Sequence, residues 1–317
     1  MVKIAIAGAN SQLARDVIDQ LEATRKHDII ALFRKDPESI PTLPGIEWIK
    51  LLFEDKVELV SLLTGVDALF CFFPAQLDKD GEAQKRLIDA TVEAGVKRYA
   101  LSEWSTGMNL APSVDVIPWY AGKIEIREYL KRINQESKVL EYSLFQPGLF
   151  LDYLDRSPNS AEHSSTIPTV ADFDRGTAIA TKRTRDTPVA YTAVEDIAKV
   201  VVRAVDFEGE WPVVGGFRGN MLSVADLVGI GEAVRGKKFQ VDVLETEDID
   251  AGVMKTDNFA RISSPAVPEE QVEAWSRMAT IGLLQSMERG CWEISDEWNE
   301  LLPDLEFVKA EEFLRNI

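Results

Sequence analysis

The sequence contains little cysteine and little histidine. Its 317 residues include two cysteines, Cys71 and Cys291, and two histidines. Two cysteines so far apart, with no paired spacing, argue against a disulfide framework and against a cysteine-rich metal site. We therefore expect no bound metal and a reducing compartment, with the cytoplasm as the default location.

Positive charge and long apolar runs are scarce as well. The chain has 35 Lys+Arg against 53 Asp+Glu, which gives a formal net charge of -18. A negative field repels phosphate backbones and anionic lipid, so we expect no nucleic-acid partner. No apolar run approaches membrane-spanning length, and the first residues lack the pattern of a signal peptide, so no membrane partner is expected either. Any phosphate would have to be bound locally.

The first half of the chain alternates between strand-like and helix-like segments. Strands are expected at 27–34, 46–51, 66–73, 96–101 and 140–145, in addition to the opening strand. The continuous apolar run at 66–73 is typical of a strand that is buried on both faces. Strict alternation implies right-handed crossovers. The fold class is therefore predicted to be α/β, with a Rossmann-type doubly wound parallel sheet.

The second half has a different character. Polar and turn-forming residues accumulate between Asp152 and Thr187, which predicts loops and a plausible substrate rim. Helices are expected again at about 194–205, 224–234 (capped by Ser223) and 269–287, with a strand near Val213. We predict a cofactor-binding domain at 1–151 with parts of 187–216. The remainder of 152–317 is predicted to form a smaller C-terminal α/β substrate lobe.

The opening of the chain is its most informative feature. Val2 to Ala7 suits a central strand, and a tight turn then leads into a helix, where phosphate would meet helix-terminal N–H groups. In a dinucleotide-binding loop three glycines permit the turn, the backbone approach and the helix packing. Gly8 supplies the first, but Ser11 and Ala14 occupy the second and third positions. The Ser11 Cβ narrows the approach, although its hydroxyl is able to donate to phosphate. The alternative is an ordinary βα turn without a ligand.

The end of the second strand bears on the choice of cofactor. An acid about 20 residues beyond the loop would select a ribose 2′-hydroxyl, and an arginine would accommodate a 2′-phosphate. Arg34 occupies that place and Lys35 follows it, which favours NADP(H). The alternative is that both merely solvate a strand end. The predicted cofactor contacts in this half are Gly8, Asn10, Ser11, Gln12, Leu13, Arg34 and Lys35.

Three later segments support a family resemblance. The segment 97–104 (KRYALSEW) resembles the "KRF-PSEFG" segment of isoflavone-reductase-like proteins, 145–150 (FQPGLF) resembles their "RPGxF" segment, and 192–198 (TAVEDIA) resembles their "VDDIA" helix start. Together with the opening loop, the chain is similar over most of its length to NmrA-like and isoflavone-reductase-like atypical short-chain dehydrogenases, especially fungal ones. The resemblance implies an NADP(H)-binding Rossmann domain with a C-terminal lobe that closes over the nicotinamide end.

The resemblance also implies a catalytic lysine on the helix after the Ser-Glu strand. Lys123 matches that position and is expected to hold the nicotinamide ribose and to deliver a proton; its alternative is a surface lysine. Tyr120 is a second catalytic candidate, but only two residues separate it from Lys123, so the Tyr-x-x-x-Lys arrangement is absent. Packing near a helix start is the alternative for Tyr120.

The remaining candidates lie near strand ends or in the variable stretch. Further cofactor contacts are expected at Phe73, Pro74, Lys123, Pro147 and Gly148, and the substrate pocket is expected to include Ser102, Glu103, Trp104, Phe150 and His163. Trp104 and Trp119 are candidates for an aromatic wall or for core packing. His163 is either a proton donor from a closing loop or a solvated side chain. Glu103 is either a pocket residue or only orders its turn.

These observations favour an NADPH-dependent reductase of a small, partly aromatic or heterocyclic specialised metabolite. A second hypothesis keeps the nucleotide but makes the protein an isomerase or cyclase. A third is a redox-sensing regulator that binds dinucleotide and a protein partner, and Lys123 weighs against it because such regulators need no catalytic lysine. Fold analogy alone does not choose among the three.

Overall fold

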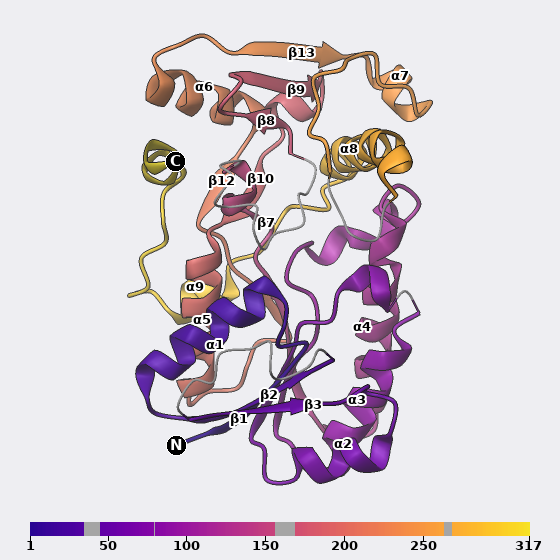
Figure 1. Cartoon of the computed structure of the whole chain (residues 1–317), viewed down its shortest axis with the longest axis vertical. Coiled ribbons are helices and arrows are strands. Elements are labelled where there is room, and N and C mark those ends of the chain that lie inside the picture. The colour runs from indigo at the N-terminus through magenta and orange to yellow at the C-terminus, as the bar shows by residue number, and fades with distance from the viewer. Residues whose placement is uncertain (35–44, 79, 156–168, 263–267) are drawn as a thin grey trace.

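The structure is a computed structural model of the chain and describes residues 1–34, 45–78, 80–155, 169–262 and 268–317 (Figure 1). Seven parallel strands form one sheet in the order β11-β6-β5-β4-β1-β2-β3. They are β1 (Lys3–Ala7), β2 (Asp28–Phe33), β3 (Ile46–Lys50), β4 (Ala68–Cys71), β5 (Arg98–Ala100), β6 (Glu141–Gln146) and β11 (Val214–Gly216). The strand order reverses between β1 and β4, which makes this the topological switch point. The predicted Rossmann-type sheet is confirmed.

Helices cover both faces of this sheet. The helices α1 (Gln12–Thr24) and α5 (Val194–Asp206) lie on one face, and α2 (Lys56–Leu63), α3 (Glu82–Glu93) and α4 (Ala121–Ile133) lie on the other. Alternate residues of β1 serve the two sides, since Ile4 and Ile6 pack toward α1 while Ala5 and Ala7 pack toward α3. The central strands β1, β2 and β4 are apolar except for Lys3 and Asp28 at their amino ends, because neither face meets water, whereas the edge strand β3 carries exposed Glu47 and Lys50.

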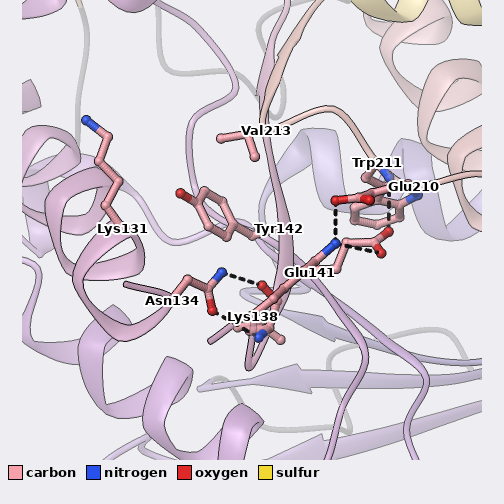
Figure 2. A pocket seen from close by; sticks show the side chains of 9 residues that line it. Lys131, Asn134, Lys138, Glu141, Tyr142, Glu210, Trp211 and Val213 are labelled. Carbon is pink, nitrogen blue, oxygen red and sulfur yellow. Dashed lines mark hydrogen bonds and ion pairs between the residues drawn. The ribbon is translucent and has the colours of Figure 1, made fainter. Parts of the chain in front are cut away.

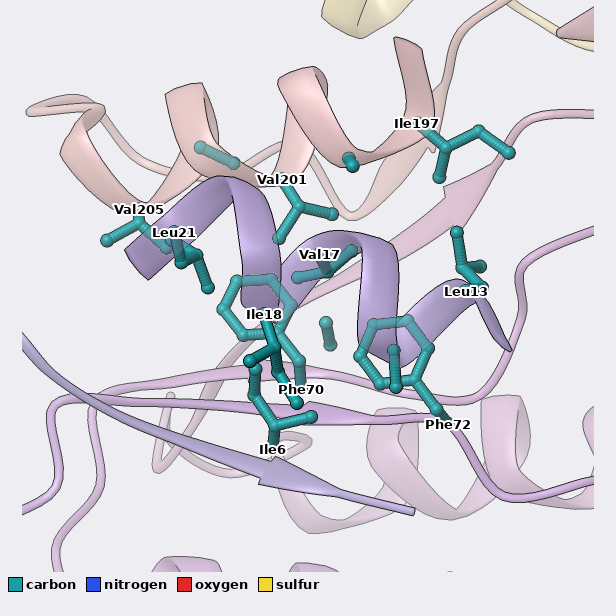
Figure 3. Packing of buried hydrophobic residues seen from close by; sticks show 14 of the residues in the cluster. Ile6, Leu13, Val17, Ile18, Leu21, Phe70, Phe72, Ile197, Val201 and Val205 are labelled. Atoms are coloured by element: carbon teal, nitrogen blue, oxygen red, sulfur yellow. The ribbon is translucent and has the colours of Figure 1, made fainter. Parts of the chain in front are cut away.

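The seam between α1 and α5 shows how these helices are held. Figure 3 shows Val17 of α1 and Val201 of α5 packed between the helices, above Ile6 and Phe70 of the sheet. All four side chains are fully buried. Burial of one such aliphatic or aromatic side chain contributes about 1.5–3 kcal/mol relative to exposure. The seam therefore joins the first helix of the chain to one that begins about 170 residues after it ends.

The C-terminal half forms a smaller lobe at the opposite end of the molecule (Figure 1). It contains two three-stranded sheets, ordered β12-β10-β7 and β13-β9-β8. Their strands are β7 (Leu149–Phe150), β8 (Ala171–Asp172), β9 (Thr177–Thr181), β10 (Val189–Thr192), β12 (Asn220–Leu222) and β13 (Gln240–Leu244), and the helices are α6 (Val224–Arg235), α7 (Thr246–Asp250), α8 (Val272–Glu288) and α10 (Ala310–Asn316). The short helix α9 (Glu297–Leu301) instead lies beside α5, and its Trp298 belongs to the core of the parallel sheet. A separate buried apolar cluster fills this lobe. The residue boundaries given for the two domains stay a prediction.

Local signals in the sequence succeeded at two helix ends. Ser223 caps α6 in a reciprocal capping box with Asp226, as its position before the helix predicts. A glycine directly after a helix-like segment predicts the end of that helix, and Gly95, with φ +75°, follows the C-cap of α3 in the left-handed conformation that glycine favours.

The stretch 152–187, for which loops are predicted, contains strands as well. Its described residues contain β8 and β9, and β9 pairs in parallel with β13, from Thr177 opposite Gln240 to Thr181 opposite Leu244. A five-residue strand next to turn residues is hard to recognise from its own sequence. The strand β9 is stabilised by pairing with β13, which is more than fifty residues away in the chain.

Candidate active site

The carboxyl ends of β1 and β4 meet at the switch point, where doubly wound sheets bind their ligands. Gly8 follows β1 with φ +80°, and a Cβ built on it would lie 2.8 Å from the carbonyl oxygen of Phe72. Phe73 and Pro74 come next after β4, so the fold brings these three predicted cofactor contacts to one edge. No other residue type fits at Gly8 without moving the backbone of the neighbouring strand end.

Ser11 begins the first helix. It is the N-cap of α1, and its hydroxyl oxygen accepts a hydrogen bond of 3.3 Å from the Ala14 N–H. Its own hydroxyl proton is not used in that bond. Within the described part of the chain, the N–H groups of Gln12 and Leu13 have no backbone acceptor, as is normal for a first helical turn. This edge therefore offers backbone and hydroxyl donors at a positive helix end.

Two arginines lie beside the loop. Arg34 is exposed at the end of β2, with its guanidinium 6.0 Å from the centre of the Phe53 ring. Arg15 was not predicted: its guanidinium lies 4.6 Å from the Trp48 ring and donates to the Asn10 side chain at 3.4 Å. Lys35 lies outside the described residues. Each of these guanidinium groups is thus held over an aromatic ring, and that of Arg34 occupies the predicted 2′-phosphate position.

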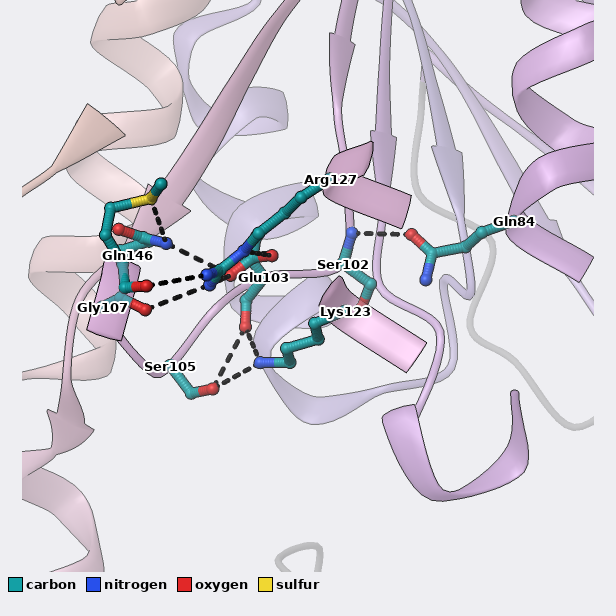
Figure 4. Close-up of polar contacts among 9 residues, drawn as sticks. Gln84, Ser102, Glu103, Ser105, Gly107, Lys123, Arg127 and Gln146 are labelled. Carbon is teal, nitrogen blue, oxygen red and sulfur yellow. Dashed lines mark hydrogen bonds and ion pairs between the residues drawn. The ribbon is translucent and has the colours of Figure 1, made fainter. Parts of the chain in front are cut away.

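Ser102 and Glu103 follow β5 and are both buried. Ser102 ties neighbouring strand ends together, because its hydroxyl donates to the Phe73 carbonyl at 2.7 Å and its N–H donates to Gln84 at 3.0 Å. The carboxylate of Glu103 accepts from Arg127 Nε at 2.8 Å and from another guanidinium nitrogen at 2.7 Å (Figure 4). The polar side-chain atoms of both predicted pocket residues are therefore hydrogen-bonded to other protein groups.

Trp104 adopts an unusual backbone conformation, with φ +33°. Its indole N–H donates to the Cys71 carbonyl at 2.7 Å, and its ring stacks on Phe72 with 4.4 Å between centroids. These contacts hold a left-handed turn that is costly for a side chain of this size. Trp104 is thus packed in the core between strand ends, and its predicted part in a substrate pocket stays a prediction.

Lys123 lies on the inward face of α4 and is 5% exposed. Its Nζ donates to the backbone carbonyl of Glu103 and to the hydroxyl of Ser105, the two residues that flank the turn at Trp104 (Figure 4). Burial lowers the pKa of Lys123 to about 8, with the Glu103 carboxylate raising it and Arg127 lowering it. The structure therefore places a buried amine, with a proton affinity suited to acid–base work near neutral pH, at the carboxyl edge of the sheet.

Tyr120 caps the N-terminus of α4 next to this amine. The ammonium nitrogen of Lys123 lies 4.4 Å from the centre of the Tyr120 ring. Burial raises the pKa of Tyr120, whereas the side chain of Ser105 lowers it. Ser105 thus interacts with both predicted catalytic residues, although the sequence reasoning did not single it out.

The residues after β6 close the other side of this region. Gly148 has φ +79°, a Cβ on it would lie 2.4 Å from the Ala190 carbonyl oxygen, and its N–H donates to the Ser105 carbonyl at 2.9 Å. The Pro147 carbonyl accepts from Thr192 Oγ1 at 2.7 Å. These contacts bring the predicted Pro147 and Gly148 next to the loop that holds Lys123.

Aromatic side chains gather nearby. Phe150 stacks on Tyr153 with 4.9 Å between ring centroids. Burial raises the pKa of Tyr153, and the nearby Tyr120 and Asp152 raise it further. The ring of Trp119 packs against the ring of Tyr120, with 6.0 Å between centroids, and against that of Trp275 of α8, with 5.6 Å between centroids. Both lobes therefore contribute rings to the surroundings of Tyr120. His163 lies outside the described residues.

Sequence reasoning missed four contributors to this region: Ser105, Arg127, Tyr153 and Trp275. One signal was available, because Lys123 and Arg127 are four residues apart and so share a helix face. The other three come from segments that only the fold brings together.

The cavity in Figure 2 lies elsewhere. Its volume is about 290 Å³, and its lining includes Lys131, Lys138 and Tyr142. Lys138 pairs with Glu210 and with Glu141, the first residue of β6, whereas Gln146 at the other end of β6 contacts Glu103. The cavity is therefore at the amino end of the strands, away from Lys123.

Metal-binding clusters and membrane-spanning helices are both absent from the described ranges. No group of three or more His, Cys, Asp or Glu side chains there is arranged to hold a metal ion. None of the helices in those ranges combines the length and apolar character that crossing a membrane requires.

The sheet order, the glycine turn and the helix start define a Rossmann-fold protein with its candidate site at the switch point. The chain belongs to the NmrA-like family, whose model matches residues 2–314. The resemblance drawn from the three segments is thereby confirmed.

The chain is distantly similar in sequence to fungal oxidoreductases. The chain is 25% identical to oxidoreductase swnN of Metarhizium robertsii, covering 100% of this chain and 97% of that protein. It is 22% identical to oxidoreductase BOA1 of Botryotinia fuckeliana, over 75% of this chain and 78% of that protein.

Solved structures share the whole fold. The NADPH complex of the Escherichia coli NADPH-dependent quinone oxidoreductase QOR2 aligns with a TM-score of 0.72 at 20% identity, covering 99% of each chain. An isoflavone reductase aligns with a TM-score of 0.70 at 19% identity, over 99% of this chain and 98% of that one. At these identities the likeness shows the fold.

Proposed function

We propose that this protein is an NADPH-dependent oxidoreductase that reduces a small, partly aromatic or heterocyclic metabolite, and that it works as an atypical short-chain dehydrogenase. The observation that carries the proposal is the buried amine of Lys123 at the carboxyl edge of the sheet, held by Glu103 and Ser105 beside Tyr120. The oxidoreductase names of the fungal relatives and the NADPH complex of QOR2 support it.

The residues at the switch point fit a dinucleotide. Gly8 leaves open a space that a Cβ would fill, and the N–H groups of Gln12 and Leu13 would hold a pyrophosphate together with the Ser11 hydroxyl. Arg34 would pair with a ribose 2′-phosphate. In this proposal Ser11 replaces a glycine but remains useful, since its oxygen caps the helix while its proton is free to be donated.

Bound NADPH would supply a hydride to an electrophilic carbon of the substrate. Lys123 would deliver the matching proton to the substrate oxygen or nitrogen that gains the electron pair, so that the two-electron reduction balances. The Ser105 hydroxyl would orient this amine and connect it to the Tyr120 hydroxyl. Because water is largely excluded from this position, hydrogen bonds to the amine are stronger than they would be in solvent.

The substrate class follows from the aromatic surroundings. Phe150 and Tyr153 lie on the strand-end side, and Trp119 contacts Trp275 from the C-terminal lobe. Aromatic rings of this kind bind planar, partly apolar molecules by stacking and edge contacts. The fold therefore supports a small-molecule partner, and the proposal needs neither nucleic acid nor membrane.

The test is to titrate purified protein with NADPH and NADH, and then to follow NADPH consumption and product mass across aromatic and heterocyclic enones, imines and ketones. We expect tighter NADPH binding and stoichiometric reduction of at least one class. No NADPH binding, or binding without hydride transfer to any of them, would contradict the proposal. Product formed without net NADPH consumption would instead identify an isomerase or cyclase.

A further inference from the structure

The Glu103–Arg127 ion pair is almost completely removed from solvent. The side chains are 0% and 5% exposed, respectively. Arg127 binds both carboxylate oxygens, and it also donates to the Gly107 carbonyl at 3.1 Å. Gln146 adds a third donor to the carboxylate, at 3.3 Å. Glu103 is therefore fully engaged and is not free to bind a substrate itself.

A pair in this position is an expensive way to stabilise a fold. Desolvation of two charges offsets most of their attraction, and apolar residues of similar volume often serve equally well. The pair must therefore be considered together with its neighbour. Lys123 is one helical turn from Arg127, and its Nζ donates to the backbone carbonyl of Glu103. Two cationic side chains of α4 thus meet at one buried residue, with Arg127 on the carboxylate of Glu103 and Lys123 on its backbone carbonyl (Figure 4).

Among the described residues, Cys291 and Tyr120 also lie close to Lys123, and both are neutral at neutral pH. Burial raises the pKa of Cys291, which follows α8, to about 12, and burial also raises the pKa of Tyr120. The charges of Glu103 and Arg127 are therefore the ones that act on the amine at neutral pH. Both are buried, so solvent screens them weakly.

We propose that Glu103 and Arg127 are positioning residues that set the proton affinity of Lys123 with opposite signs: Glu103 keeps the amine protonated and Arg127 helps it to release its proton. This inference rests on the proposed function for its catalytic meaning, because only a proton donor needs such tuning. The pair as a whole is nearly neutral, so Lys123 experiences a balance of two opposing fields. Burial of Lys123 lowers its pKa to about 8, which brings the amine close to working pH.

The test measures the titration of Lys123 directly. Protein labelled with ¹⁵N and ¹³C in lysine is titrated by NMR without added nucleotide, and the Lys123 signal is assigned by its loss in Lys123→Met. We expect Glu103→Gln to shift the titration to lower pH and Arg127→Met to shift it to higher pH, each by roughly one unit or more. Shifts of the same sign, or no shift, would overturn the inference.

Each single variant leaves a buried charge without its partner and is at risk of misfolding. The double variant Glu103→Gln/Arg127→Met removes both charges and is expected to titrate within a few tenths of a unit of the parent protein. A double variant whose Lys123 midpoint stays as far from that of the parent protein as the midpoint of either single variant would count against the proposal.

The pH dependence of hydride transfer separates this inference from the proposed function. The rate is expected to fall as pH rises through the Lys123 titration, with its midpoint moving in each variant as the NMR midpoint moves. Opposite NMR shifts with a fully active Lys123→Met enzyme would retain the tuning and reject the catalytic role. A Lys123→Met enzyme without activity, combined with unshifted NMR midpoints, would do the reverse.

Discussion

The loop after β1 and the loop after β5 lie at the same edge of one sheet but are built from different materials. The first uses a glycine turn, helix-terminal N–H groups and a capping hydroxyl, and its residues at Gly8, Asn10 and Ser11 are partly exposed. The second uses charged side chains at 5% exposure or less, held by specific hydrogen bonds. A backbone site depends on shape, whereas a buried charged site depends on which charges are present.

This difference decides how each loop responds to mutation. At the β1 loop a side chain in the wrong place blocks an approach, so volume should matter more than charge. At the β5 loop an isosteric change of charge should matter, because the amine and its neighbours are poorly screened.

The largest effect is expected from Lys123→Met, which removes the amine and keeps most of the side-chain volume. Loss of a positioned acid typically costs 10²–10⁴-fold in rate, so the rate of hydride transfer should fall by about that factor. NADPH affinity should change by less than about ten-fold, since Arg34 and the β1 loop remain. Stopped-flow hydride transfer and a binding titration measure the two quantities. Lys131→Met, an exposed lysine on the same helix, should leave both unchanged. Equal losses of rate and affinity would mean that the lysine mainly binds the cofactor.

Gly8→Ala tests the β1 loop by shape alone. The new Cβ meets the Phe72 carbonyl at 2.8 Å with φ at +80°, so we expect roughly 2–3 kcal/mol lower stability and at least about ten-fold weaker NADPH binding. The matched control is Gly95→Ala, which has φ +75° but no atom within 4 Å of its Cβ. It should cost roughly 1 kcal/mol and leave NADPH affinity intact. Thermal unfolding and nucleotide titration compare the two variants, and similar results would remove the clash from the explanation.

The same contrast explains what the sequence could and could not predict. Gly8 and Gly95 were recognisable because each conformation is decided by a few consecutive residues. The sheet was recognisable for the same reason, since strands such as β2 and β4 carry their own apolar runs. The role of Ser11 was only half visible: its place in the motif suggests a phosphate donor, but its cap to Ala14 required the helix start to be placed.

The β5 loop was less visible because its partners are distant in the chain. Glu103 was predicted as a pocket residue, yet its carboxylate is spent on Arg127, 24 positions later, and on Gln146, 43 positions later. Nothing in the segment around Glu103 specifies those partners. Spacing alone predicts that Lys123 and Arg127 share a face, but only the fold shows that both contact Glu103, Lys123 at its backbone carbonyl and Arg127 at its carboxylate.

Arg34→Gln should produce a smaller and more selective effect. Loss of a charged hydrogen bond to a 2′-phosphate should weaken NADPH binding by roughly ten-fold and leave NADH binding nearly unchanged. Arg25→Gln, at the far end of α1, makes the same change in net charge and should alter neither the NADPH affinity nor the NADH affinity. Parallel titrations with the two nucleotides give the answer. If Arg34→Gln weakens both nucleotides equally, the guanidinium acts through the general field; if it weakens neither, Arg15 becomes the candidate reader of the phosphate.

The smallest effect concerns Asp16, a half-buried carboxylate on α1. Burial, with smaller contributions from Asp152 and Asp19, raises its pKa from 3.8 to about 6. A folded pKa above the unfolded one means that the native state binds the extra proton, so stability is greatest below the unfolded pKa and falls as pH rises through about 6. After discounting for partial exposure, Asp16→Asn should add about 1 kcal/mol, or roughly 2 °C in Tm, at pH 7.5, and the gain should disappear near pH 4. Asp28→Asn makes the same charge change at an exposed site, and an equal gain there would trace the effect to net charge. Because Asp16 contacts neither Lys123 nor its partners, the pH dependence of hydride transfer should stay where it was, so that titration on the β1 side alters stability while titration on the β5 side alters rate.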